Sequence, residues 1–429
     1  MSSETFGQAL RRIRTNRGLS LRGVGDLVNY SRQYIHDIET ERRKPLPDLA
    51  EALDRALQTD GYLAHLASDK IEVPDSNGLP SLAADMWRRS DAESLAARLT
   101  SEKPTPDNAL RLAHQWLVTD PPQHFELSAG RHIGDDLVEK VEQRIHQIRL
   151  MDDHIGGLDT HAVVTAELAA TATLVREAAF PERVGKRLLA AVGELCQIGG
   201  WIAADAGRHE EARRLYLAGA RAAHAAGDLP GGASNLSSLA YQIANTGNPH
   251  EAVLLARSAY RGAERIATPG TRALLLERVA WAHARADEAG AAERALGQVD
   301  EAFAETRTDP EPIWIYWLSP EEIEIMAGRV WTELHRPLRA VPVLEHAIAS
   351  YGDDIPRETS MYLTWLAESL IHGGEIDRAA AVASQAVRLA RQAHSTRATE
   401  RIQTIRRVLE PHRQQELVRA FLEELREGP

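Results

Sequence analysis

Apolar residues recur at helical spacing through the first part of the chain. Phe6, Leu10 and Ile13 share one face of a predicted helix, and Gly18 follows as a stop signal. Ser20 is a suitable N-cap for a second, short helix. The apolar residues of that second helix are Leu21, Val24, Leu27 and Val28.

A third helix is predicted over SRQYIHDIET, with Ser31 as its N-cap. In this helix Tyr34, Ile35 and Ile38 can face inward. The outward residues are Arg32, Gln33, His36 and Asp37. A fourth helix is expected over PDLAEALDRAL. Two short helices joined by a tight turn are typical of a helix-turn-helix domain.

The second half of the chain contains an internal repeat. Five segments align on one small residue, found at Ala212, Ala252, Ala292, Ala340 and Ala379, with intervals of 40, 40, 48 and 39 residues. Another small residue precedes the turn in each segment, where the two helices of a pair would approach closely: Gly200, Ala240, Ala280, Gly328 and Ala367. A period of this length predicts stacked helix pairs. The long interval contains the insertion TDPEPIWIYWLSP.

The distribution of charge changes what the net charge of -12 implies. Residues 1–45 carry nine Lys or Arg and five Asp or Glu, which gives +4 and leaves -16 for the rest. A basic head suits contact with phosphates, and an acidic body repels DNA outside that head. We therefore expect double-stranded DNA to be bound by the head alone.

The stretch LSLRGVGDLVNYSRQYIHDIETERRKP resembles the lambda-repressor-like, or XRE-type, helix-turn-helix family over about residues 5–66. The resemblance implies base-reading positions at Arg32, Gln33 and His36, beside Ser31 and Tyr34. Phosphate contacts fall on the loop residues Arg42, Arg43 and Lys44. Relatives often open the second helix with Gln, whereas this chain has Leu21 followed by Arg22. The Gln contact is therefore lost, and a contact of Arg22 with the DNA backbone is expected in its place.

The repeats resemble tetratricopeptide repeats, whose first helices line a concave surface. In that family the residue after the first small residue faces the hollow, and here this position holds Trp201, Tyr241 and Trp281, then Arg329 and Glu368. The resemblance implies an aromatic ladder that binds a peptide or small-molecule effector. Polar partners are expected at Gln197, Asn245, Glu277 and Arg329. Two alternatives remain: the aromatic residues only fill gaps between repeats, or the sensory site lies around Trp314 and Trp317.

We therefore expect an all-α protein, with an N-terminal helix-turn-helix bundle followed by a tetratricopeptide-like α-solenoid. The predicted boundaries are 1–66 for the DNA-binding domain, 67–80 for a linker, 81–160 for a helical connecting segment, 161–395 for the repeats and 396–429 for a C-terminal capping or dimerisation helix. The combination is similar to actinobacterial XRE regulators and to peptide-sensing regulators of Gram-positive bacteria. It implies a homodimeric transcription regulator, with the apolar stripe of residues 417–425 as the first candidate dimer surface.

Several other classes are not supported by the sequence. No nucleotide-binding glycine loop or nucleophile-elbow motif is present, so no enzyme and no cofactor are expected. The histidines lack metal-ligand spacing, and MDDHIGG at 151–157 is interpreted as a polar helix end. The chain lacks a signal-peptide pattern and has one cysteine, which favours the cytoplasm and no membrane. The alternative function is a scaffold whose helix-turn-helix domain binds a protein partner.

Overall fold

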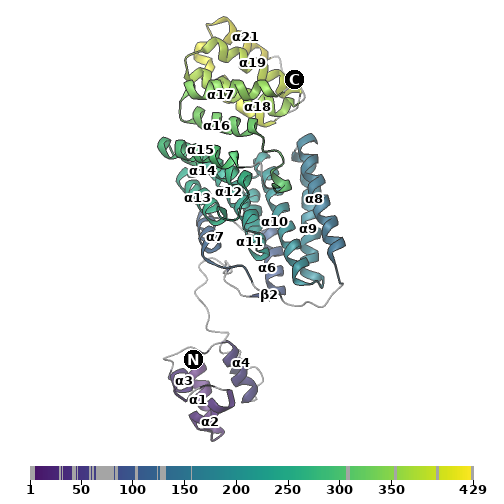
Figure 1. The fold of residues 1–429 in the computed structure, drawn as a ribbon, viewed down its shortest axis with the longest axis vertical. Helices are drawn as coiled ribbons and strands as arrows, with labels where there is room; N and C mark the ends of the chain where they lie inside the picture. Colours follow the sequence, from purple (N-terminus) through teal and green to yellow (C-terminus); the bar gives the residue numbers. More distant parts are fainter. Residues whose placement is uncertain are drawn as a thin grey trace. The chain divides into compact units, whose positions relative to one another are not determined.

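The computed structural model describes residues 5–28, 30, 32–40, 45, 47–57, 59, 62–63, 82, 86–101, 105–122, 124–125, 132–155, 157–305, 310–351, 355–392 and 396–426. The chain divides into two compact units, residues 1–80 and residues 81–429 (Figure 1). Helices dominate both units, as predicted. Among the described residues, one small addition is a parallel pair of two-residue strands, β1 (Met86–Trp87) and β2 (His124–Phe125).

Among the described residues, the first unit contains four short helices packed as a bundle. They are α1 (Phe6–Asn16), α2 (Leu21–Val28), α3 (Arg32–Glu39) and α4 (Pro47–Ala56). Gly18 ends the first helical segment in the left-handed region, at φ 64°, where glycine is favoured. The Ser20 hydroxyl accepts a hydrogen bond from the Gly23 amide at 3.0 Å, which is the N-cap predicted for α2. The predicted caps and apolar faces therefore produce this bundle.

A partly buried ion pair fixes α3 against α1. The Arg14 guanidinium donates two hydrogen bonds to the Glu39 carboxylate, at 2.6 Å from Nε and 2.9 Å from Nη2. Its Nη1 also donates to the carbonyl oxygen of Leu19, at 3.0 Å. A bidentate guanidinium–carboxylate pair is directional, so it holds the orientation of α3 as well as its distance. The ion pair therefore holds the outer face of α3 in a fixed orientation.

Four helices that precede the first helix pair pack onto the repeats. They are α6 (Arg89–Ser101), α7 (Pro106–Val118), α8 (Asp135–Ile155) and α9 (Gly157–Glu177). Trp116 on α7 is buried, and its indole fills the space over two glycines of the repeats, Gly232 and Gly262. A Cβ at Gly262 would lie 2.0 Å from the indole, so only glycine permits this contact. The connecting segment therefore shares a core with the repeats.

Five helix pairs follow in the order that the repeat predicts. The pairs are α10 (Glu182–Asp205) with α11 (His209–Ala226), α12 (Leu229–Thr246) with α13 (Pro249–Ala263), α14 (Pro269–Arg285) with α15 (Ala289–Ala304), α16 (Pro320–Glu333) with α17 (Pro337–Ser350), and α18 (Pro356–His372) with α19 (Ile376–Gln392). The first helix of each pair packs against the first helix of the next. Among the described residues, one helix, α10, is long and apolar enough to span a membrane by length and composition. However, 67% of its most apolar window is buried inside the unit, and core helices of soluble proteins meet the same criteria.

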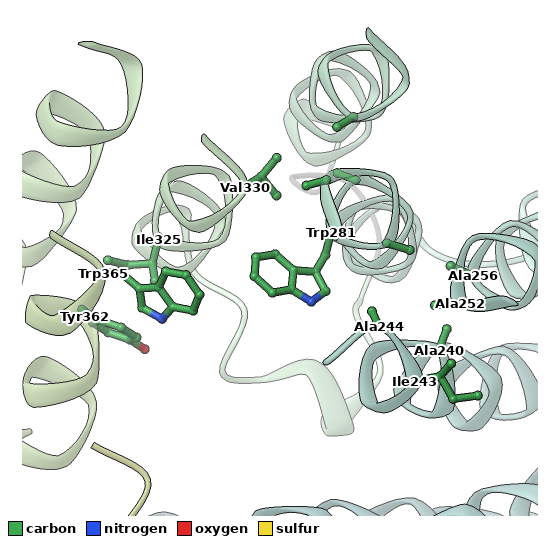
Figure 2. Packing of buried hydrophobic residues seen from close by; sticks show 14 of the residues in the cluster. Ala240, Ile243, Ala244, Ala252, Ala256, Trp281, Ile325, Val330, Tyr362 and Trp365 are labelled. Atoms are coloured by element: carbon green, nitrogen blue, oxygen red, sulfur yellow. The ribbon is translucent and has the colours of Figure 1, made fainter. Parts of the chain in front are cut away.

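The repeated small residues lie where the helices of a pair approach closely. A Cβ at Gly200 would lie 2.6 Å from the Tyr216 ring, and one at Gly328 would lie 2.6 Å from the Leu344 side chain. Alanine fills the equivalent position in the other three pairs and is fully buried there, at Ala240, Ala280 and Ala367. The repeat in the sequence is therefore a repeat in helix packing. Figure 2 shows one of these positions, with Ala240 near Ala252 and Ala256.

The insertion between α15 and α16 is anchored to neighbouring helices. It contains the single 3-10 turn η1 (Ile313–Ile315), which lies against α8. The Glu311 carboxylate accepts a hydrogen bond from the Gly270 amide at 2.7 Å, at the beginning of α14. Trp314 and Trp317 are partly buried. The insertion therefore links the connecting helices to the middle of the repeat array.

The chain ends in a helical cap. After α19 come α20 (Thr396–Leu409), the turn η2 (Glu410–His412) and α21 (Glu416–Arg426), which packs against α19. Val418 and Phe421 are fully buried and Leu422 is nearly so, whereas Leu417 is 45% exposed. The apolar stripe expected as a dimer surface thus mainly faces the chain's own core. The last repeat needs apolar residues to cover its outer face, and this stripe provides them.

Candidate functional site

A row of aromatic rings runs along the first helices of successive pairs. The Trp201 and Tyr241 rings are stacked, with centroids 5.8 Å apart and planes at 22°. Tyr241 and Trp281 follow at 6.1 Å. The row continues to Trp365 on α18, whose ring meets that of Trp281 edge to face at 5.6 Å, and Figure 2 shows these two indoles pointing toward each other. The row joins α10, α12, α14 and α18.

The rings differ in how much of them solvent can reach. Trp281 is only 4% exposed, and its Nε1 donates a hydrogen bond to Asn245 Oδ1 at 3.2 Å. Trp201 and Tyr241 are partly exposed. Trp281 therefore acts as packing between repeats in this arrangement, which agrees with the gap-filling alternative for that residue. The accessible part of the row is formed by Trp201 and Tyr241.

Two of the expected polar partners have hydrogen-bond partners within the chain. Gln197 Nε2 donates to the Ser238 hydroxyl at 3.3 Å, and its Oε1 accepts from Arg149 Nη1 at 3.4 Å. Asn245 is exposed, and its Nδ2 donates to the Tyr241 carbonyl oxygen at 2.9 Å. These contacts orient the side chains beside the rings. A ligand that used these donors would replace existing hydrogen bonds, which limits their net contribution.

Two guanidinium groups lie over the rings. The Arg278 carbon Cζ is 4.6 Å from the Tyr241 centroid and 5.7 Å from the Trp201 centroid. The Arg329 Cζ is 5.6 Å from the Tyr241 centroid and 5.0 Å from that of Trp281. The Arg329 Nη2 also donates to the Tyr241 hydroxyl. Each separation is within the range of a cation–π interaction, so the rings hold both cations in place.

A carboxyl group is buried beside these cations. Glu277 is 2% exposed and Arg278 is 8% exposed, and the Glu277 Oε1 has no hydrogen-bond partner. Burial raises the pKa of Glu277 to about 8, against the opposing effect of Arg278 and Arg329. Burial lowers the pKa of the Arg278 guanidinium. Glu277 is therefore largely protonated at neutral pH, and the two arginines give the cluster its charge.

The predicted DNA-reading residues lie at the beginning of α3. Arg32 and Gln33 are exposed, and His36 is partly exposed on the same helix. Gln33 Nε2 donates to Asp37 Oδ1 at 2.9 Å, so this amide must turn away from Asp37 to bind a base edge. Tyr34 packs on Tyr30 with ring centroids 5.0 Å apart, and its ring therefore belongs mainly to the core of the bundle.

Of the remaining predicted DNA contacts, Arg22 lies among the described residues. Arg22 is exposed on α2, at the second residue of that helix. Ser31, Arg42, Arg43 and Lys44 lie outside the described residues. Their roles stay predictions from the sequence.

Comparison with known proteins identifies the first unit. Residues 5–66 match a family described as a helix-turn-helix domain. This part of the chain is a helix-turn-helix domain. None of the curated proteins matches the chain. Among solved structures, PlcR of Bacillus thuringiensis in complex with the peptide PapR7 and DNA is similar at 9% identity, over 98% of this chain and 93% of that one, with a TM-score of 0.27. A TM-score this low does not establish a shared fold.

The sequence reasoning identified most rings of the row but missed two important members. Arg278 lies one helical turn before Trp281, so a search for polar residues three positions before each ring would have found it. Trp365 lies three positions before Glu368, the residue that the repeat alignment placed in the row. Its contact with Trp281 joins α14 to α18, which are not consecutive in the array, so the repeat alignment does not predict it.

Proposed function

We propose that the protein is a DNA-binding transcription regulator whose repeat unit binds an effector. The observation that carries this proposal is the pair Arg32 and Gln33, exposed at the beginning of the second helix of a helix-turn-helix domain. In this motif that end of the helix enters the major groove. The arginine fork matches the O6 and N7 acceptors of guanine, and the glutamine amide matches adenine.

The two units would perform separate tasks in this regulator. The helix-turn-helix domain supplies the basic surface, and the acidic remainder of the chain limits binding to unrelated DNA. The accessible rings Trp201 and Tyr241 supply the surface for an effector. An effector acts only through different affinities for two arrangements of the protein. Its binding must therefore change DNA affinity, and DNA must change effector affinity by the same factor.

Arg32→Ala and Gln33→Ala are each expected to weaken binding to the cognate operator by about 1 to 3 kcal/mol, because each removes a bidentate base contact. Affinity for unrelated DNA should change little. The operator is first selected from random duplexes by the full chain, and affinities are then measured by fluorescence anisotropy at fixed salt. A variant that loses equal affinity on every sequence contacts phosphate and does not read bases.

Arg11→Ala provides a matched control for this experiment. Arg11 is an exposed arginine on α1, so the variant removes the same charge from a different helix. We expect it to weaken cognate and unrelated DNA by similar factors. If the full-length protein selects no sequence at all, the proposal of a DNA-binding regulator fails and the scaffold function becomes the better account.

The regulator is expected to be a homodimer joined through the repeat unit. A single small DNA-binding module buries too little surface for high specificity, and dimers of this motif bind half-sites about 34 to 36 Å apart or at multiples of that spacing. Light scattering at micromolar concentration should give about twice the chain mass of 47.3 kDa. A mass near that of one chain, with and without operator DNA, would contradict this expectation.

A further inference from the structure

We propose that the effector is an organic carboxylate with an apolar or aromatic body, bound with its carboxylate between Arg278 and Arg329 and its body on the rings of Trp201 and Tyr241. The inference deepens the proposed function and rests on it in taking the ring row as the effector site. It assigns the ligand's charge and the two residues that recognise it.

Arg278 and Arg329 differ from other arginines of this unit in their ion pairing. Other arginines on the helices of this unit have carboxylate partners: Arg149 pairs with Glu194, Arg285 with Glu333, and Arg401 with Glu368. Among the described residues, no carboxylate lies within ion-pair distance of Arg278 or Arg329. These two guanidinium groups therefore lack the counter-ions that the fold provides for their neighbours.

Both guanidinium groups are also at least partly shielded from solvent. Arg278 is 8% exposed, and the Arg329 Nε is buried without an acceptor. Burial lowers the pKa of the Arg278 guanidinium, and the nearby positive charge of Arg329 lowers it further. Burying unpaired charges is costly, and an anion placed between them would relieve that cost.

Glu277 does not act as an internal counter-ion for these arginines. Glu277 is the adjacent acid, but its burial raises its pKa to about 8, so it is mainly uncharged at neutral pH. Glu277 therefore does not neutralise the two arginines at neutral pH. An external carboxylate would supply the negative charge that Glu277 does not.

The two guanidinium groups and the rings are arranged so that N–H donors lie beside aromatic surface. Arg278 lies over Trp201 and Tyr241, and Arg329 lies over Tyr241, so one ring is shared by both cations. Stacking uses the face of a guanidinium group, whereas carboxylates bind to its N–H edge. Of the donors, Arg329 Nη2 binds the Tyr241 hydroxyl, and Arg278 makes no hydrogen bond to the described residues. The partly exposed rings of Trp201 and Tyr241 lie beside these donors and suit the ligand's apolar body.

Two sources provide this chemistry: a small aromatic acid and the free C-terminus of a short peptide. The experiment uses both, each as a matched pair. Full-length protein is titrated by calorimetry with phenylacetate and phenylacetamide, and with N-acetyl-leucyl-phenylalanine as its free acid and its amide. Both acids should bind, and each amide should bind at least about tenfold more weakly because it lacks the charge-assisted hydrogen bonds. The tighter acid identifies the source.

Variants test the two assigned residues. Arg278→Gln and Arg329→Gln should each weaken binding of the acids by at least about tenfold and leave the amides nearly unaffected. Arg401→Gln is the matched control, because Arg401 stacks on Trp365 at 3.6 Å but already pairs with Glu368. It should leave acid affinity unchanged. Arg278→Lys keeps the positive charge at this position. Thermal unfolding of every variant separates loss of the site from loss of the fold.

The possible outcomes separate this inference from the function on which it rests. Equal binding of acids and amides, no heat from either acid at millimolar concentration, or equal losses in the Arg401 variant would each overturn the anion site. DNA selection by the same protein tests the regulator independently. If DNA is selected and no acid binds, only the anion site fails. If an acid binds through Arg278 and Arg329 but no DNA is selected, the regulator fails and the anion site stands.

Discussion

Phe421→Ala is expected to destabilise the repeat unit by about 3 to 5 kcal/mol, because it removes a large aromatic side chain from a fully buried position and leaves a cavity. The effect should be strongest in the last helix pair, since each pair of a repeat array depends mainly on its neighbours. Urea unfolding followed by circular dichroism should give a lower midpoint. Hydrogen exchange should show the loss of protection concentrated in α19, α20 and α21.

Leu417→Ala is the matched control for that substitution. Leu417 lies on the same helix but is 45% exposed, so its truncation should cost much less stability. If α21 were instead a dimer surface, Leu417→Ala would raise the dissociation constant of the homodimer and Phe421→Ala would act through dimer loss. A larger effect of Leu417 than of Phe421 would therefore contradict the capping role.

The local elements of this fold were predictable because each is written in a short stretch of sequence. Ser20 and Gly18 define the boundaries around α2 by capping and by a left-handed turn. The five pairs were predictable for a similar reason. Gly200 and Gly328 can be replaced only by movement of the facing Tyr216 and Leu344, so the packing constraint is recorded in the sequence as small residues at regular spacing.

The environment of each side chain in the ring row was not predictable in the same way. The alignment placed Trp281 on a ligand surface, but the edge-to-face contact with Trp365 and the Asn245 hydrogen bond bury it. That contact joins α14 to α18 across two repeats. Periodicity describes neighbouring helices, whereas this burial depends on the curvature of the array. For the same reason, the sequence did not single out Arg278 as a cation without a partner.

The C-terminal stripe illustrates a different limit. Its apolar residues at helical spacing predict a buried face, and burial is what Val418, Phe421 and Leu422 have. The pattern cannot distinguish burial against the preceding repeat from burial against a second chain, because both environments select the same residue types. The contact of α21 with α19 decides between them for these residues.

Glu277→Gln should stabilise the protein at mildly alkaline pH, by an amount that grows from pH 5 to pH 8. The pKa of Glu277 is raised from an ordinary value of 4.5 to about 8 in the folded state. Below the ordinary value both folded and unfolded states hold the proton, so the acid costs nothing. As pH rises toward 8 the unfolded state loses its proton while the folded state keeps it, and stability falls. Glutamine has the same shape and does not titrate.

The gain at pH 8 is on the order of 1 to 4 kcal/mol and should fall toward zero near pH 5. Chemical denaturation of wild type and variant at a series of pH values measures it. The charges that act on Glu277 are Arg278 on its own helix, and Arg329 and Asp300 on neighbouring helices. Glu301→Gln is the control, because Glu301 is exposed on α15 and loses the same charge at the surface. If Glu277→Gln is less stable than wild type at pH 8, Glu277 is ionised and serves as the internal partner of the two arginines. That result would also mean that Arg278 and Arg329 have an internal counter-ion, which would contradict the proposed site for an external carboxylate.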